Sequence, residues 1–262
     1  MPPIYAIGDI HGQKDMLDNA LSLIAADGGD DAQIIFLGDY VDRGPDSRGV
    51  IDTLMQGQAA GRPWTFLLGN HDRFFARFIR EGRQHDPRVK SGLNWLNPRL
   101  GGAQTLQSYG VVGQMHFAEQ KFGEEEKLVH CETEAGWITP EALIAAAQAS
   151  IPEDHIAFIE SLPLWHETDH LLCVHAGLRP HISLEHQDPE DLIWIRDGFL
   201  ETNHNFGQLV VHGHTALDHP QHFGNRVDLD GGAGYGRPLV PAVFEGRHCW
   251  TLTDQGRVAL TV

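Results

Sequence analysis

Five short motifs in this 262-residue sequence carry side chains that can bind metal ions, and each motif follows an apolar run. The motifs present Asp9 and His11, Asp39, Asn70, His175 and His214. Oxygen and imidazole ligands without cysteine suit hard or borderline divalent metals such as Mn, Fe or Zn. One such motif is common by chance, and a lone histidine after a strand is more often a core residue. Five in order, four of them beside glycine, indicate a metal site.

The stretch Gly-Asp-Tyr-Val-Asp-Arg-Gly at residues 38–44 is the most informative of these motifs. It follows the apolar run 34–37, and open α/β sheets place their sites outside the carboxyl ends of strands. Asp39 is a metal-type ligand, while the planar guanidinium of Arg43 suits two phosphoryl oxygens. We therefore expect Asp39 at the centre of the site.

The first third of the sequence repeats one unit of strand, polar loop and helix. Strands are expected at 4–7, 34–37 and 64–68, with helices that end near residue 28, span about 47–60 and run through 74–79. Three such units predict stacked βαβ elements with a parallel sheet between helices. All three loops then open on the same edge of the sheet.

Later apolar runs predict more strands. Those at 171–174 and 209–211 deliver His175 and His214, and short runs at 226–229, 239–244, 248–252 and 258–262 indicate an antiparallel meander. Because a meander cannot extend a βαβ unit, we expect it to form a second sheet packed against the first. We predict one domain over 1–262, with an insertion at about 82–134 that is either a substrate lid or a surface excursion.

Composition limits the classes of function. A formal net charge of −17 argues against a nucleic-acid-binding module, which needs clustered Lys and Arg. No apolar run approaches 18 residues and no charged leader precedes one, so neither a membrane span nor a signal peptide is expected. Three cysteines without CxxC spacing indicate reduced thiols in the cytoplasm.

The motifs GDIHG (8–12), GDYVDRG (38–44), GNHD (69–72), VHAG (174–177) and HGHT (212–215) resemble those of the calcineurin-like metallophosphoesterases. The arginine of GDYVDRG, and Ala216 where a second histidine often stands, are most similar to the phosphoprotein phosphatase branch with its bacterial and lambda-type members. The resemblance implies a four-layer α/β/β/α sandwich in which two mixed sheets pack face to face between helices.

Carried over residue by residue, the resemblance implies two divalent ions, most simply Mn, with Fe or Zn as alternatives. Asp9, His11 and Asp39 would hold one ion and Asp39, Asn70, His175 and His214 the other, and a hydroxide bridging the ions would attack phosphorus directly. His71 would protonate the leaving oxygen, and Asp72 would fix the His71 tautomer, although Asp72 also suits the first turn of a helix. Arg43 and, on a looser alignment, Arg196 would bind phosphate, and His212 would stay outside the ligand set.

The preferred interpretation of the function is a phosphomonoesterase acting on phosphoserine or phosphothreonine proteins or on small phosphoesters. A first alternative is a hydrolase of dinucleoside polyphosphates such as diadenosine tetraphosphate, or of capped RNA 5′ ends. A second alternative is a non-catalytic scaffold. Such a protein is expected to have lost one or more metal ligands, and the five motifs retain all of theirs. No stable nucleic-acid or membrane partner is expected, and the oligomeric state stays open.

Overall fold

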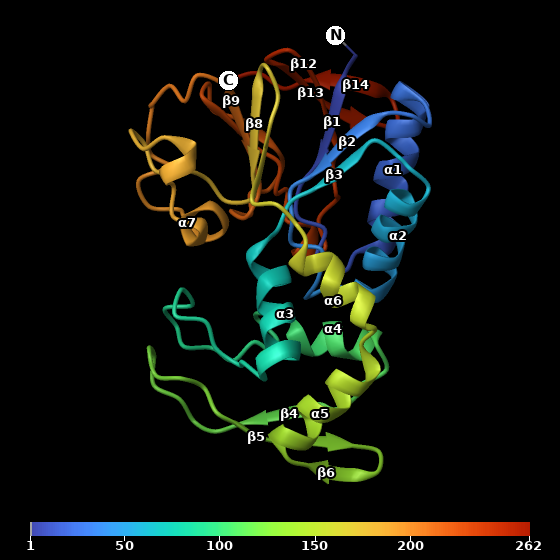
Figure 1. Cartoon of the computed structure of the whole chain (residues 1–262), viewed down its shortest axis with the longest axis vertical. Helices are drawn as coiled ribbons and strands as arrows, with labels where there is room; N and C mark the ends of the chain where they lie inside the picture. Colours follow the sequence, from blue (N-terminus) through green and yellow to red (C-terminus); the bar gives the residue numbers. More distant parts are fainter. Residues whose placement is uncertain (1) are drawn as a thin grey trace.

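A six-stranded sheet forms the centre of the upper part of the molecule in the computed structural model, which describes residues 2–262 (Figure 1). Its strand order is β14-β13-β12-β1-β2-β3. The strands are β1 (Ile4–Ile7), β2 (Gln33–Phe36), β3 (Trp64–Phe66), β12 (Ala242–Glu245), β13 (His248–Thr253) and β14 (Gly256–Ala259). β1, β2 and β3 are parallel, as the repeated unit of strand, loop and helix predicts.

A second sheet of five strands faces the first, in the order β10-β11-β9-β8-β7. These strands are β7 (Trp165–Glu167), β8 (Leu171–Val174), β9 (Leu209–His212), β10 (Gln221–His222) and β11 (Arg226–Asp228). The inner three, β8, β9 and β11, are parallel to one another. Their carboxyl ends therefore also meet at one edge.

Alternation of side chains along the strands separates the layers. In β2 and the residue after it, Ile34 and Phe36 join the core against the helices, whereas Ile35 and Leu37 join the core between the two sheets. Helices α1 (Lys14–Gly28) and α2 (Ser47–Ala59) cover the outer face of the first sheet, and α7 (Pro189–Trp194) packs on the outer face of the second (Figure 1). The predicted order of helix, sheet, sheet and helix is confirmed.

The C-terminal meander belongs to a different sheet from the one we expected. β12, β13 and β14 pair antiparallel with one another, but β12 also pairs antiparallel with β1, so the meander extends the first sheet. The expectation that it would build the second sheet is wrong. An antiparallel strand at the edge of an otherwise parallel sheet is common, and the edge of β1 away from β2 accepts one. The second sheet is instead centred on the strands that precede His175 and His214.

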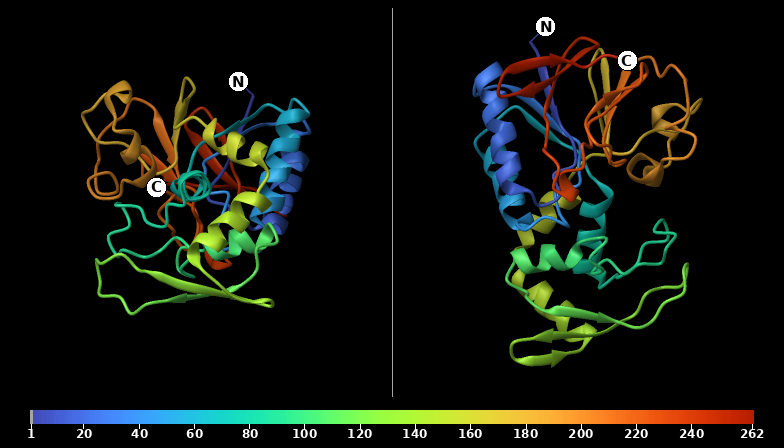
Figure 2. Two further views of the ribbon diagram at one scale, coloured as in Figure 1. Left: turned by 60° about the horizontal axis from the view of Figure 1, so that its bottom comes forward. Right: turned by 180° about the vertical axis from the view of Figure 1, so that it is seen from behind.

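The region after β3 extends away from the two sheets as a lower lobe (Figure 2). It contains α3 (Asn70–Glu81), α4 (Gly102–Ser108), a three-stranded sheet of β4 (Gln114–Phe117), β5 (Leu128–Thr133) and β6 (Gly136–Ile138), then α5 (Pro140–Ser150) and α6 (Glu153–Glu160). The predicted insertion at about 82–134 covers α4, β4 and β5 and ends just before β6. Two short 3₁₀ turns, η1 (Leu184–His186) and η2 (Ala233–Tyr235), complete the elements.

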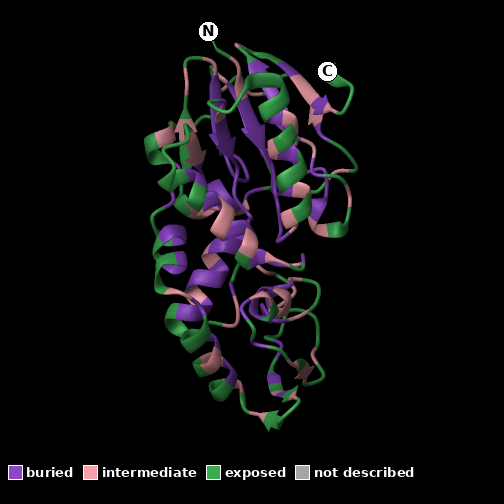
Figure 3. Ribbon diagram, turned by 90° about the vertical axis from the view of Figure 1, so that its right-hand side faces the viewer, coloured by how far each residue is buried: buried purple, intermediate pink, exposed green. Residues whose placement is uncertain are grey.

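Burial follows this division. In Figure 3 the central strands of the first sheet, β1, β2 and β12, are mostly buried, whereas the small sheet of the lower lobe is largely exposed or half-buried. All three cysteines are buried and free. Within residues 2–262, no helix is both long and apolar enough to cross a membrane.

Candidate metal centre

Residues from five strand-end loops converge at the lower edge of the two sheets. His11 Nε2 lies 3.8 Å from an Asp9 oxygen and 3.6 Å from Asp39 Oδ2. On the other side of Asp39, His175 Nε2 lies 3.4 Å from Oδ1. Asn70 Oδ1 joins the second group, at 3.0 Å from His175 Nε2 and 2.8 Å from His214 Nδ1. None of the six side chains is more than 6% exposed.

These donors fit two ions that share one carboxylate. Two groups have all their ligand atoms within 4.8 Å of one another: His11, Asp39 and His71 in the first, where His71 stands in place of the expected Asp9, and Asp39, His175 and His214 in the second. Asp39 belongs to both and turns a different oxygen toward each. In His214, Nδ1 faces the ligand candidate Asn70 at 2.8 Å, while Nε2 is buried and has no hydrogen-bond partner among the described residues. Two-metal sites in hydrolases have this arrangement.

The loop that carries Asp39 is held by the buried carboxylate of Asp72. Asp72 accepts backbone N–H groups from Gly69 (3.0 Å), Asp39 (2.7 Å), Tyr40 (2.8 Å) and Val41 (3.3 Å). Asp39 itself has a φ of 55°, in the left-handed region that non-glycine residues seldom adopt. A Cβ on Gly69 would lie 2.1 Å from Asp39 Oδ1, so only glycine permits this approach.

Charge in the site is distributed unevenly. Burial and the nearby Asp230 raise the pKa of Asp9 well above its usual range. Burial also pushes the pKa of Asp39 upward, but His175 and His71 more than offset it and leave that pKa well below the usual range. Burial lowers the pKa of His175, yet Asp39 outweighs it and raises the value to about 9.

Two of the imidazoles are held neutral, the form that binds metal. Burial and Arg43 lower the pKa of His11, and burial and Arg196 lower that of His214. His11 donates from Nδ1 to the Val41 carbonyl at 2.8 Å, which leaves its Nε2 lone pair facing Asp39. A hydrogen bond to the far nitrogen of a ligand histidine fixes its tautomer in this way.

His71 is paired with Asp42, and the expectation that Asp72 would orient it is wrong. His71 Nδ1 lies 2.6 Å from Asp42 Oδ2, whereas the oxygens of Asp72 are taken by the four backbone N–H groups. Asp72 faces away because it sits at the third position of α3, where a side chain turns back to the start of the helix. Asp42, the second acid of GDYVDRG, is a functional residue that the sequence analysis missed, although the motif displayed it.

The lower lobe supplies two further donors to Asp42. Trp95 donates its indole N–H to Oδ2 at 2.9 Å, and Thr105 donates its hydroxyl to Oδ1 at 2.7 Å. Asp42 is fully buried, so these contacts and His71 replace the water that its charge has lost. The insertion therefore contributes to the site itself.

Both predicted phosphate-binding arginines reach the site. Arg43 donates to His11 Nε2 at 2.6 Å and to His71 Nε2 at 3.1 Å. Arg196 donates to the His214 carbonyl at 3.1 Å. Both nitrogens that accept from Arg43 can instead bind an ion or a proton. When they do, the Arg43 guanidinium loses these acceptors and its N–H groups become available to phosphate.

Two other residues near the centre complete the comparison with the sequence. His212 bonds Arg226 at 3.1 Å and its own loop carbonyl at 3.0 Å, and burial lowers its pKa to about 3. It lies outside both ligand groups. Asp230, 3% exposed, adds negative charge beside Asp9 and was missed, although it too precedes glycine just after a strand.

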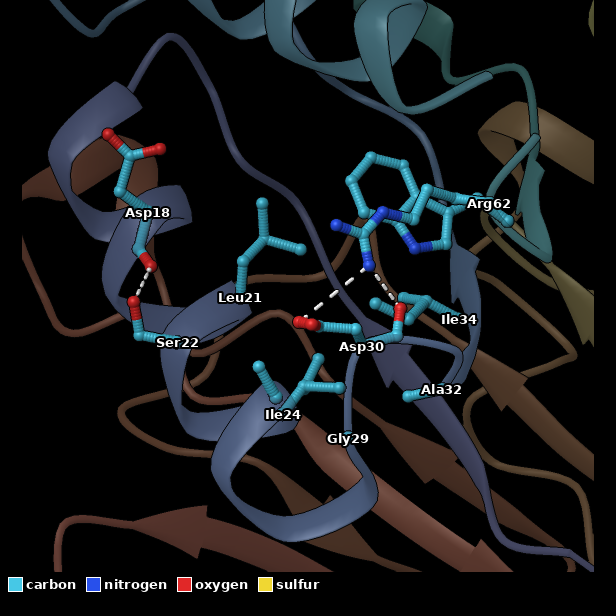
Figure 4. A pocket seen from close by; sticks show the side chains of 11 residues that line it. Asp18, Leu21, Ser22, Ile24, Gly29, Asp30, Ala32, Ile34 and Arg62 are labelled. Atoms are coloured by element: carbon cyan, nitrogen blue, oxygen red, sulfur yellow. Dashed lines mark hydrogen bonds and ion pairs between the residues drawn. The ribbon is translucent and has the colours of Figure 1, made fainter. Parts of the chain in front are cut away.

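A separate surface hollow of about 400 Å³ lies between α1 and the starts of β2 and β3 (Figure 4). Arg62 lies across it, 3.8 Å from an Asp30 carboxylate oxygen, over apolar side chains that include Leu21 and Ile34. None of the metal-ligand candidates lines it. We therefore place the chemistry at the strand ends.

The family model for calcineurin-like phosphoesterases matches residues 2–235, and the chain belongs to this family. Two similar relatives are symmetrical bis(5′-nucleosyl)-tetraphosphatases. The protein of Janthinobacterium sp. (strain Marseille) is 44% identical over 26% of this chain and 23% of its own length. That of Delftia acidovorans is 30% identical over 55% of this chain and 50% of its own length. The chain thus aligns with half or less of either relative.

Solved structures show the same fold. One, provisionally described as a diadenosine tetraphosphatase, superposes with a TM-score of 0.61 at 20% identity and covers 96% of this chain and 93% of that one. A cold-active protein tyrosine phosphatase superposes with a TM-score of 0.60 at 15% identity, over 100% of this chain and 79% of the other.

If Asp39 is shared by two ions, Asp39→Asn should lower occupancy at both, whereas His214→Ala should mainly empty one. Elemental analysis of Mn-loaded protein measures this directly. Mn should also raise the melting temperature of the unmodified chain by about 5 to 10 °C at 100 times the Kd. Equal metal losses in the two variants would argue against a bridging carboxylate.

The two buried carboxylates beside His71 should respond differently to amidation. Asp42→Asn should keep both ions but lower kcat for phenyl phosphate, whose leaving oxygen is strongly basic, by about 100-fold or more, since it removes the partner that holds the His71 tautomer. Asp72→Asn should lose metal and stability, because an amide N–H then faces backbone donors at a cost of about 1 to 3 kcal/mol. Metal content, melting temperature and kcat, measured on both variants, distinguish the roles; identical profiles contradict them.

Proposed function

We propose that this chain is a two-metal hydrolase of dinucleoside polyphosphates such as diadenosine tetraphosphate. One observation carries the proposal: the curated relatives that align with part of this chain are symmetrical bis(5′-nucleosyl)-tetraphosphatases. This favours the alternative over the phosphomonoesterase that the intact GDYVDRG motif suggests. Hydrolysis of phosphoproteins remains the second candidate, supported by Arg43 and by that motif.

The ligand set of Asp9, His11, Asp39, Asn70, His175 and His214 would hold the two ions. When bound, such ions acidify water and neutralise phosphoryl oxygens. Arg43 and Arg196 lie on either side of this set and would fix the scissile phosphoryl group. Burial of every ligand excludes bulk water, which strengthens these charge interactions.

The proposed reaction is symmetrical. Water attacks an inner phosphorus of diadenosine tetraphosphate, the P–O bond at the middle of the chain breaks, and two ADP molecules leave. The proton from water passes to the surroundings, and the leaving phosphate oxygen is a weak base that departs with little help. His71 has its Nδ1 proton held by Asp42 and accepts from Arg43 at Nε2; once Nε2 has taken up a proton in place of the Arg43 contact, His71 would supply that proton to more basic leaving groups.

An exposed aromatic ring beside the site is consistent with a nucleotide. Tyr235, at the end of η2, is 59% exposed, and its ring centre lies 4.9 Å from the Arg43 guanidinium carbon. Flat aromatic faces stack with bases of any sequence. Tyr235 could therefore receive one adenine while Arg43 holds the phosphoryl group next to it.

Parallel assays with added Mn should give a higher kcat/KM for diadenosine tetraphosphate than for a phosphoserine peptide or p-nitrophenyl phosphate. ADP should be the only nucleotide product, as measured by chromatography. ATP and AMP in equal amounts would contradict the symmetrical reaction. A higher kcat/KM for the phosphopeptide would establish the second candidate in place of the first.

His71→Asn tests the acid role through leaving groups. We expect both ions to stay bound and hydrolysis of phenyl phosphate to fall by about 100-fold to 10,000-fold. p-Nitrophenyl phosphate and diadenosine tetraphosphate should be impaired much less, because their leaving oxygens are weaker bases. The same loss on all three substrates would mean that His71 orients phosphate or water, and loss of metal would place it among the ligands.

A further inference from the structure

A cavity of about 420 Å³ adjoins the metal centre on the side of α7, a volume in the range of small-molecule sites (roughly 300–1,000 Å³). It is lined by Arg88 and Lys90 from the loop after α3, Arg179 from the loop after β8, and Trp194 and Arg196 at the end of α7. In Figure 1 the loop that follows α3 lies below α7. The cavity therefore lies between the lower lobe and the second sheet.

The lining of the cavity is cationic. Four basic side chains face two acidic ones, Asp191 and Asp197, in a chain whose formal net charge is −17. Asp191 is 1% exposed and is shared: Arg88 donates to one oxygen at 3.2 Å and Arg179 donates to the other. One buried carboxylate thus holds two guanidinium groups together, and each has N–H donors to spare.

The remaining two basic side chains, Lys90 and Arg196, form fewer or weaker contacts within the protein. Lys90 is 86% exposed and lies 3.9 Å from Asp197, which is itself 95% exposed, so this pair contributes little. Arg196 forms no ion pair within residues 2–262 and donates only to the His214 carbonyl. Fixing the lobe to α7 does not require these two, since Arg73 and Arg77 of α3 already bind Glu190 at 2.6 and 3.4 Å.

Arg196 and Trp194 join this cavity to the metal centre. Arg196 lines the cavity and bonds the backbone of a metal-ligand candidate, and the Trp194 ring centre lies 6.0 Å from that of His214. A phosphate chain attached to the group under attack would thus extend from the ions past Arg196 to the other cations.

We infer that the cavity formed by Arg88, Lys90, Arg179, Trp194 and Arg196 binds the phosphate groups of the substrate beyond the one attacked. This rests on the proposed function, in which the leaving half is a nucleoside diphosphate. Bidentate guanidinium groups suit phosphate oxygens, and two of them preset by one buried carboxylate need little ordering on binding. The local cations also offset the repulsion that the negative chain exerts on a polyphosphate.

The test compares inorganic tripolyphosphate with inorganic phosphate as inhibitors of p-nitrophenyl phosphate hydrolysis by the full Mn-loaded chain, at constant free Mn. In Arg88→Gln/Lys90→Ala, the inhibition constant for tripolyphosphate should rise about tenfold, as expected for lost hydrogen bonds between charged groups. The constant for phosphate, which needs only the metal centre, should change less than twofold. The KM for diadenosine tetraphosphate should rise together with the inhibition constant for tripolyphosphate.

Two further variants keep the test decisive. Lys90→Ala alone alters an exposed side chain and leaves Asp191 paired, so it should fold normally and still weaken tripolyphosphate about threefold. Arg48→Gln on α2, whose side chain is half exposed and 3.8 Å from Asp52, is the matched control and should change neither constant.

The outcomes separate the two proposals. Equal tripolyphosphate inhibition of the unmodified chain and both cavity variants would overturn the cavity assignment, whether or not diadenosine tetraphosphate is hydrolysed. A chain that leaves diadenosine tetraphosphate intact but still shows the selective loss of tripolyphosphate inhibition refutes the proposed function and retains the cavity.

Discussion

The buried carboxylate of Asp72 holds the loop on which the metal centre depends. Its oxygens accept N–H groups from Gly69 and from three successive residues that begin at Asp39. Burial raises the pKa of Asp72 to about 7, so its charge is costly, and the donors from Tyr40 and Gly69 act in the opposite direction. Bound cations nearby favour the ionised form further. Metal binding and loop geometry are therefore coupled through this one group.

Strand-end motifs made the centre of the site predictable, because parallel strands bring their carboxyl ends to one edge whatever lies between them in sequence. His175 and Asp39 are far apart in sequence and belong to different sheets, yet they lie 3.4 Å apart because the two sheets pack with the carboxyl ends of their parallel strands at the same edge. Long-range partners were harder to predict. Which acid faces His71 depends on the direction of side chains in α3. The motifs GDYVDRG and GNHD contain Asp42 and Asp72, and neither motif marks its acid as the partner of His71.

Sequence patterns could not predict which sheet the meander joins or which side chains of the insertion contact the site. Alternation identifies β12, β13 and β14 as strands, but sheet membership depends on which edge is free, and β1 offered one. Nothing in the spacing of Trp95 and Thr105 marks them as partners of Asp42, since their hydrogen bonds join positions 53 and 63 residues away. In a sequence, an apolar or small polar residue of this kind is interpreted as an ordinary residue of the hydrophobic core.

The insertion touches both chemistry and binding, which has a consequence for the way such enzymes diverge. Arg88 and Lys90 line the cationic cavity, while Trp95 and Thr105, which lie 5 and 15 residues beyond Lys90 in the same insertion, donate hydrogen bonds to Asp42. Under the proposals made above, selectivity and proton transfer would share one segment of chain. Exchanging that segment between relatives is not a modular swap: a graft with new substrate contacts must also bring its own donors to Asp42, so the two properties evolve together.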